Sequence, residues 1–259
     1  MLTTDFVTGS PSWLDLGSPD VDAAVRFYGA VFGWTFESAG PEAGGYGFFR
    51  KEDKTLAGIG PLTEEGASSA WTVYFQTPDA EATAKLVEQA GGTVRVPASD
   101  VFDSGRMAAF TDPGGAEFAV WQPSAVKGFE LASEPNALCW VELQSGDATA
   151  ALAFYRSIFG WRAQEMEMPG MKYTVLSTAD GDQQDASFGG ITPQPTRDAG
   201  SVWAAYLAAE DSDATVAKVL ENGGSILMPA TDVPEIGRIA WFADPFGAWF
   251  AILQPLAPQ

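Results

Sequence analysis

Two carboxylates occupy corresponding places in two similar segments, where they could take part in proton transfer. Asp15 follows Trp13 by two residues, and Glu142 follows Trp140 by two residues, each within an apolar stretch. A carboxylate beside apolar walls tends to have a raised pKa and can serve as a general acid or base. Alternatively, each carboxylate accepts a hydrogen bond from a neighbouring Tyr or Arg and only satisfies a buried polar position. We name Asp15 and Glu142 as candidate catalytic residues and keep both interpretations open.

The composition of the chain argues against several other kinds of catalytic site. The chain contains no histidine and a single cysteine, Cys139. Because no imidazole is available to activate it, we expect Cys139 to be a small buried apolar side chain rather than a nucleophile. One cysteine cannot form a disulfide within the chain, which fits a reducing compartment. Nothing in the sequence resembles a phosphate-binding glycine loop, a nucleophile elbow or a histidine-assisted triad.

The charge of the chain limits its partners. Its 259 residues include 14 basic and 34 acidic ones, a formal net charge of −20. Long-range attraction to nucleic acid or to an anionic membrane is therefore not expected. No apolar run approaches the ~20 residues that span a bilayer, and the N-terminus lacks a basic region followed by an apolar one. We expect a cytoplasmic monomer or homodimer with neither nucleic acid nor membrane as a partner.

A long repeat divides the chain into halves, and each half divides again into two units of similar design. Each unit has an apolar strand, a helix and then shorter strands separated by turns, which predicts four βαβββ modules. In the first module, apolar residues recur at helical spacing after Ser18 as a cap and Pro19 at the first helical position, and Gly33 ends the helix. The repeated motifs are Phe27-Tyr28, Phe32-Gly33-Trp34 and Asp112-Pro113, which return as Phe154-Tyr155, Phe159-Gly160-Trp161 and Asp244-Pro245.

The order of these motifs resembles the glyoxalase, bleomycin-resistance and extradiol-dioxygenase superfamily, also called vicinal oxygen chelate proteins. The segments around Trp13 and Trp140 look like a two-domain actinobacterial branch described as hydroxylase-like. The resemblance implies an α+β fold in which the four modules form two tandem glyoxalase-like domains, with curved mixed sheets that form clefts. We expect domain 1 over residues 8–124, a linker over 125–135 and domain 2 over 136–256.

In metal-dependent members of this superfamily, ligands come from the first and last strands of the modules. None of the side chains that the resemblance assigns to these positions is a normal ligand of a catalytic divalent metal. We therefore expect no metal and no other cofactor. The six positions are Trp13, Thr72, Ala119, Trp140, Ala204 and Ala251.

Strand alternation extends the same register to the residues that would line the clefts. A tryptophan at a ligand position either plugs a closed cavity or forms a stacking wall for a flat ligand. We favour the wall, because Ala208, Gly17 and the three alanines at ligand positions leave room. The predicted ligand-binding residues are Trp13, Thr72, Tyr74, Gln76, Trp121, Trp140, Gln144, Tyr206 and Trp249.

Two repeated arginines, Arg106 and Arg238, could bind an anionic ligand group, but we expect structural ion pairs with Asp112 or Asp244. The sequence does not decide how the modules pair. The first could pair with the second and the third with the fourth, or the first with the fourth and the second with the third.

Three functions follow from these observations. The first is a metal-free binder of a small aromatic or apolar molecule, which sequesters a natural product for self-resistance or assists its biosynthesis. The second is a metal-independent enzyme in which Asp15 or Glu142 moves a proton in an isomerisation, cyclisation, elimination or hydrolysis. A metal-dependent glyoxalase or dioxygenase ranks third, because the ligand positions do not fit it.

Overall fold

A computed structural model describes residues 2–63, 66–168, 170–182, 184–194 and 200–256 of the chain. It confirms the four predicted βαβββ modules. The first module contains β1 (Pro11–Ser18), α1 (Val21–Phe32), β2 (Thr35–Ser38), β3 (Gly47–Lys51) and β4 (Lys54–Pro61), with a short 3-10 helix at Pro41–Ala43. The second contains β5 (Ala70–Gln76), α2 (Ala80–Gln89), β6 (Thr93–Val101), β7 (Gly105–Thr111) and β8 (Glu117–Pro123).

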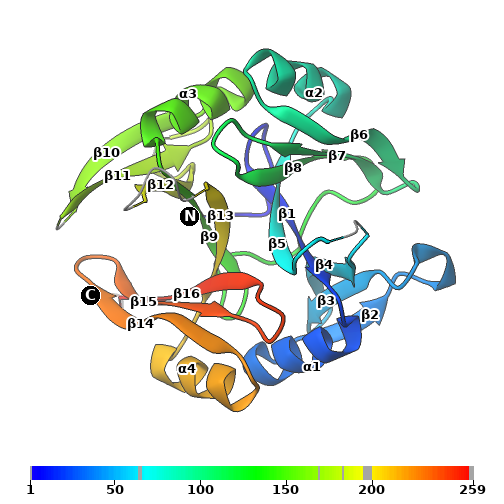
Figure 1. Ribbon diagram of the computed structural model, residues 1–259, viewed down its shortest axis with the longest axis vertical. Coiled ribbons are helices and arrows are strands. Elements are labelled where there is room, and N and C mark those ends of the chain that lie inside the picture. The colour runs from blue at the N-terminus through cyan, green and yellow to red at the C-terminus, as the bar shows by residue number, and fades with distance from the viewer. Residues whose placement is uncertain (1, 64–65, 169, 183, 195–199, 257–259) are drawn as a thin grey trace. The chain divides into compact units, whose positions relative to one another are not determined.

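The second half of the chain repeats this plan. The third module contains β9 (Leu138–Ser145), α3 (Ala148–Phe159), β10 (Arg162–Met168), β11 (Met171–Ser177) and β12 (Ser187–Pro193). The fourth contains β13 (Val202–Ala208), α4 (Ser212–Glu221), β14 (Ser225–Val233), β15 (Gly237–Ala243) and β16 (Trp249–Pro255). In Figure 1, α2 lies along β6 and β7, and α4 lies along β14 and β15.

The strands form two eight-stranded mixed sheets. Their orders are β2-β3-β4-β1-β5-β8-β7-β6 and β10-β11-β12-β9-β13-β16-β15-β14. In every module the first strand runs parallel to the last, and the neighbouring hairpin strands are antiparallel. The fold is therefore the predicted α+β arrangement of two tandem glyoxalase-like halves.

The compact units of the structure combine modules from different halves. One unit comprises Met1–Trp13, Thr72–Gly128 and Trp140–Ala204, and the other comprises Leu14–Trp71, Phe129–Cys139 and Ala205–Gln259. The second module thus shares a unit with the third, where α2 packs against α3, and the first shares a unit with the fourth, where α1 packs against α4. Both pairings that the sequence left open are therefore present at different levels. The strands join the first module to the second and the third to the fourth in one sheet each, whereas the helix contacts follow the crossed pairing, which joins the second module to the third and the first to the fourth.

Aspartates cap all four helices. Asp20, Asp79, Asp147 and Asp211 each accept a hydrogen bond from the backbone N–H three residues later. The predicted cap at Ser18, with Pro19 as the first helical residue, is wrong. Asp20 has an extended backbone, and its carboxylate both satisfies a free N–H and suits the positive end of the helix dipole. The predicted stops are confirmed, since Gly33 and Gly160 have left-handed φ angles of 72° and 68°.

Buried hydrogen-bond chains join the crossed modules within each unit. In one unit the Trp71 indole donates to the Tyr28 hydroxyl at 2.9 Å, and Tyr28 donates to Asp244 at 3.2 Å. In the other, Trp203 donates to Tyr155 at 2.8 Å and Tyr155 donates to Asp112 at 3.0 Å. The two aspartates are 4% and 5% exposed, and each also accepts two backbone N–H groups of its own turn. Their carboxylates are therefore satisfied by neutral donors.

The predicted ion pairs of these aspartates with arginine are wrong. Arg106 pairs with Asp100 at 3.0 Å, and Arg238 pairs with Asp213 at 2.9 Å and with Asp232 at 3.0 Å. Asp100 and Asp232 lie directly opposite the arginines on the neighbouring strands. The arginines thus pair with exposed aspartates, and the buried Asp112 and Asp244 are left to neutral donors.

No helix among the residues that the structure describes is long and apolar enough to cross a membrane.

Asp112 and Asp244 should make stability depend on pH. Burial raises the pKa of both carboxyls above the ordinary value of 3.8, against the opposing effect of the hydrogen bonds that they accept. A raised folded-state pKa contributes stability that is complete below the ordinary value and is lost as pH rises through the folded-state value. We expect the free energy of unfolding of the wild type, relative to Asp112→Asn, to fall in urea titrations as pH rises above the ordinary value of 3.8.

The matched control is Asp53→Asn, which changes an exposed carboxylate. Its difference from the wild type should be nearly independent of pH. A wild type that gains stability relative to Asp112→Asn as pH rises would contradict the raised pKa of the Asp112 carboxyl.

Candidate functional site

Both candidate carboxylates have a tyrosine partner. The Tyr46 hydroxyl donates to Asp15 Oδ1 at 2.6 Å. In the corresponding place of the third module, Tyr173 is hydrogen-bonded to Glu142 and accepts a hydrogen bond from the Trp140 indole at 2.8 Å. The tyrosine partner that the structural interpretation anticipated is therefore present twice. Asp15 and Glu142 belong to different compact units.

A glycine makes room for each tyrosine. Gly58 on β4 lies opposite Asp15, and Gly190 on β12 lies opposite Glu142. A Cβ atom at Gly58 would lie 1.9 Å from the Tyr46 hydroxyl, and one at Gly190 would lie 2.1 Å from the Tyr173 hydroxyl. Any other residue there would push the tyrosine from its carboxylate. We call each set of carboxylate, tyrosine and glycine a dyad site, named after its carboxylate.

Sequence reasoning missed the tyrosines and glycines, although a signal was available. Tyr46 and Tyr173 fall in corresponding places of the two halves, and so do Gly58 and Gly190. Asp15 and Glu142 were predicted because they are acidic residues at equivalent positions on the inner face of the first strands. The tyrosine and the glycine are thus repeated in both halves together with the carboxylate.

The Glu142 dyad site is well shielded from water. Glu142 and Tyr173 are each 8% exposed. Burial raises the pKa of Tyr173 well above its ordinary value of 10, and the negative charge of Glu142 raises it further. Tyr173 therefore keeps its proton near neutral pH and acts as a hydrogen-bond donor. A carboxylate held in this way still has lone pairs that can accept a donor group of a ligand or take up a proton.

The predicted ligand-binding aromatics differ in exposure. Trp13, Tyr74 and Trp121 are each 7% exposed and Tyr206 is 4% exposed, so they contribute mainly to packing. Trp140 is half-buried, and Trp249 is 46% exposed. A stacking wall needs an accessible ring face. Trp140 and Trp249 meet this requirement best.

The polar members of the predicted set are half-buried. Thr72 and Gln76 lie on β5, and Gln144 lies on β9. The side chain of Gln76 donates to the carbonyl oxygen of Phe6 at 3.3 Å, which occupies one of its donors. In the second module, strand register places Tyr74 beside Ala119 and Gln76 beside Trp121, so these predicted residues do share a face.

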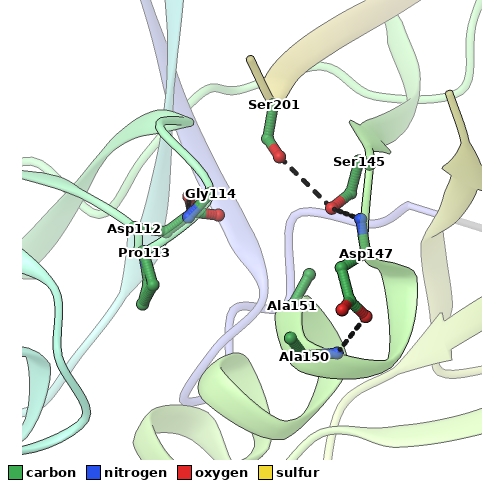
Figure 2. Close-up of a pocket in the computed structure, with 9 residues that line it drawn as sticks. Asp112, Pro113, Gly114, Ser145, Asp147, Ala150, Ala151 and Ser201 are labelled. Atoms are coloured by element: carbon green, nitrogen blue, oxygen red, sulfur yellow. Dashed lines mark hydrogen bonds between the residues drawn. The ribbon is translucent and has the colours of Figure 1, made fainter. Parts of the chain in front are cut away.

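The pocket drawn in Figure 2 lies elsewhere. Its volume is about 250 Å³, and Ser145 and Ser201 meet there with a distance of 3.2 Å between their hydroxyl oxygens. A second pocket of about 250 Å³ is lined by several aspartates and by Phe188. Neither contains a predicted site residue. Gly114 lines the first pocket, and Phe246 stands at the corresponding position of the fourth module.

Comparison with known proteins identifies the family. The model of the "Glyoxalase/Bleomycin resistance protein/Dioxygenase superfamily" matches residues 10–120 and 137–252. The chain belongs to this superfamily. "Anthracycline biosynthesis protein DnrV" of Streptomyces peucetius is 38% identical over 97% of this chain and 95% of its own. "Putative glyoxylase CFP32" of Mycobacterium tuberculosis is 36% identical over 99% of this chain and 98% of its own.

Solved structures of the superfamily share the fold. The Mn(II)-bound glyoxalase from Novosphingobium aromaticivorans aligns with a TM-score of 0.66 and 15% sequence identity, over 96% of this chain and 83% of that one. At this identity the likeness concerns the fold alone.

The residues at the six positions that the sequence resemblance assigns to metal ligands do not fit a divalent metal. Ala119 and Ala251 are completely buried, Ala204 is 1% exposed, and the other three positions hold Trp13, Thr72 and Trp140. Within the described part of the chain, no group of three His, Cys, Asp or Glu side chains could hold a metal ion. Oxygen, nitrogen and thiolate ligands must converge on such an ion, so we derive no metal chemistry for this site.

The Glu142 dyad site should depend on Gly190. We expect Gly190→Ala to displace Tyr173, leave Glu142 without its donor and lower the free energy of unfolding by about 1–3 kcal/mol. Urea unfolding followed by tryptophan fluorescence measures this, since Trp140 is bonded to the displaced tyrosine. Gly200→Ala is the control, because a Cβ there meets nothing within 4 Å. Equal stability of Gly190→Ala and the wild type would contradict the role of the glycine.

Proposed function

We propose that this protein binds a flat, partly apolar small molecule without a metal ion. The observation that carries the proposal is the chemistry of the six metal positions, which hold tryptophan, threonine and alanine in a fold otherwise retained. Trp140 and Trp249 keep accessible surface that can stack on a planar ring system. A carboxylate of a dyad site can accept a hydroxyl or amine group of a ligand.

The relative DnrV supports an aromatic natural product as the ligand class. Its name places it in anthracycline biosynthesis, and anthracyclines contain a planar system of fused rings. The similarity covers 97% of this chain and 95% of DnrV, so the two proteins share both halves. Sequestration for self-resistance and an auxiliary role in biosynthesis both require such binding.

A metal-independent enzyme is the second candidate, and the dyad sites favour it. In that case Glu142 or Asp15 takes a proton from the substrate while its tyrosine, neutral and hydrogen-bonded, keeps the carboxylate in place. Tyr173 does not compete for this role, because its raised pKa leaves it protonated. The reaction class would be an isomerisation, cyclisation, elimination or hydrolysis.

A titration with 1,8-dihydroxyanthraquinone tests the binding proposal. We expect saturable quenching of tryptophan fluorescence with a dissociation constant on the order of micromolar, typical of an aromatic ligand in an apolar site. Prior treatment with EDTA should leave the affinity unchanged, and mass spectrometry should recover the compound unaltered. Binding that EDTA abolishes would contradict a metal-free site.

The same mixture distinguishes the enzyme. If the compound or a related polyketide is converted, Glu142→Gln and Asp15→Asn should reduce turnover while EDTA does not. Turnover unaffected by both substitutions would exclude proton transfer by these carboxylates.

A further inference from the structure

The fourth module presents an aromatic face on the side of its strands away from α4. Trp249 lies opposite Ala243, Trp241 opposite Ala251 and Ile239 opposite Leu253, so their side chains alternate onto the same side. Tyr206 joins them from β13, beside Ala251. We call this set the module-four face: Tyr206, Ile239, Trp241, Trp249 and Leu253. The rings of Tyr206 and Trp241 meet edge to face, with centroids 5.5 Å apart at 87°.

The corresponding face of the second module has different chemistry. Glu117 of the second module corresponds to Trp249 of the fourth, since each stands five residues after the aspartate of the Asp-Pro turn. Likewise Arg95 corresponds to Leu227, since each stands three residues after a Gly-Gly pair. Glu117 and Arg95 form an ion pair with each other. Hydrated charges therefore occupy, in one copy of the module, the positions that hold exposed apolar side chains in the other.

The exposed members of the module-four face are poorly suited to water. Trp249 is 46% exposed, and Ile239 and Leu253 are half-buried. Leu227 on β14, the counterpart of Arg95, is also 46% exposed. The paired register places no charged side chain on this side of the described strands of the module, because Arg238 and Asp232 point the other way and Arg238 also reaches Asp213 on α4. On a chain with a net charge of −20, such an uncharged aromatic surface is typical of an interaction site.

We infer that the module-four face is the binding surface for an uncharged planar aromatic ring system, and that the second module does not bind a second molecule. This inference rests on the proposed function and deepens it. Trp249 stacks on the ligand, and the buried pair of Trp241 and Tyr206 forms the surface on which the ligand rests. Because Ala109 and Glu117 replace the two tryptophans in the second module, the chain takes one ligand rather than two.

Isothermal titration with 1,8-dihydroxyanthraquinone tests this inference. We expect one equivalent per chain, and Trp249→Ala should weaken binding about tenfold through loss of stacking. Trp249→Phe should retain most of the affinity. The matched control is Glu117→Ala at the corresponding position of the second module, which should bind as the wild type does. Thermal unfolding of each variant checks that the fold is intact, as expected at an exposed position.

The possible outcomes separate the inference from the proposal on which it rests. Two equal equivalents per chain, or wild-type affinity in Trp249→Ala, would overturn the inference and leave the proposed function standing. A change of Trp249→Ala from dimer to monomer with unchanged affinity would overturn it too, since the face would then contact a second copy of the chain. No binding by the wild type would contradict the proposed function itself.

Discussion

A carboxylate removed from water must be given hydrogen-bond donors, and this requirement organises both compact units. Asp112 and Asp244 are almost completely buried, and each accepts two N–H groups of its own turn and a tyrosine hydroxyl from a module in the other half of the chain. Leaving such a group without its donors would cost about 1–3 kcal/mol or more. Specific hydrogen bonds as well as apolar packing therefore hold module one against module four and module two against module three.

The same physical rule recurs at Asp15 and Glu142, with a different consequence. There the donor is a tyrosine that packs against a glycine of the neighbouring strand. The carboxylates lie on the first strands, from which the sequence resemblance predicts metal ligands. The buried carboxylates of Asp112 and Asp244 connect modules of different halves. Carboxylates of the first strands, each held by a neutral donor, remain able to bind a ligand group. Aromatic and small residues then complete surfaces that suit an organic molecule better than an ion.

Patterns local in sequence predicted most of the fold. Helical spacing between Val21 and Phe32 and the stops at Gly33 and Gly160 depend on neighbouring residues, so they could be read directly. The partner of a buried side chain depends on tertiary contacts, which explains why Tyr28 with Asp244 was not foreseen and why Arg238 was assigned the wrong aspartate. Tertiary contacts also decide that Trp249 is exposed while Trp121 is buried, so the sequence did not distinguish the two. The ligand-binding and catalytic assignments remain predictions.

The central claim is that the protein holds an organic molecule and no metal ion. Native mass spectrometry combined with elemental analysis, on protein purified from an extract of cells that produce aromatic natural products, tests it most directly. The account predicts a bound species with the mass of one organic molecule per chain and no stoichiometric metal. One equivalent of iron, zinc or manganese per domain would contradict it and restore the metal chemistry of the superfamily.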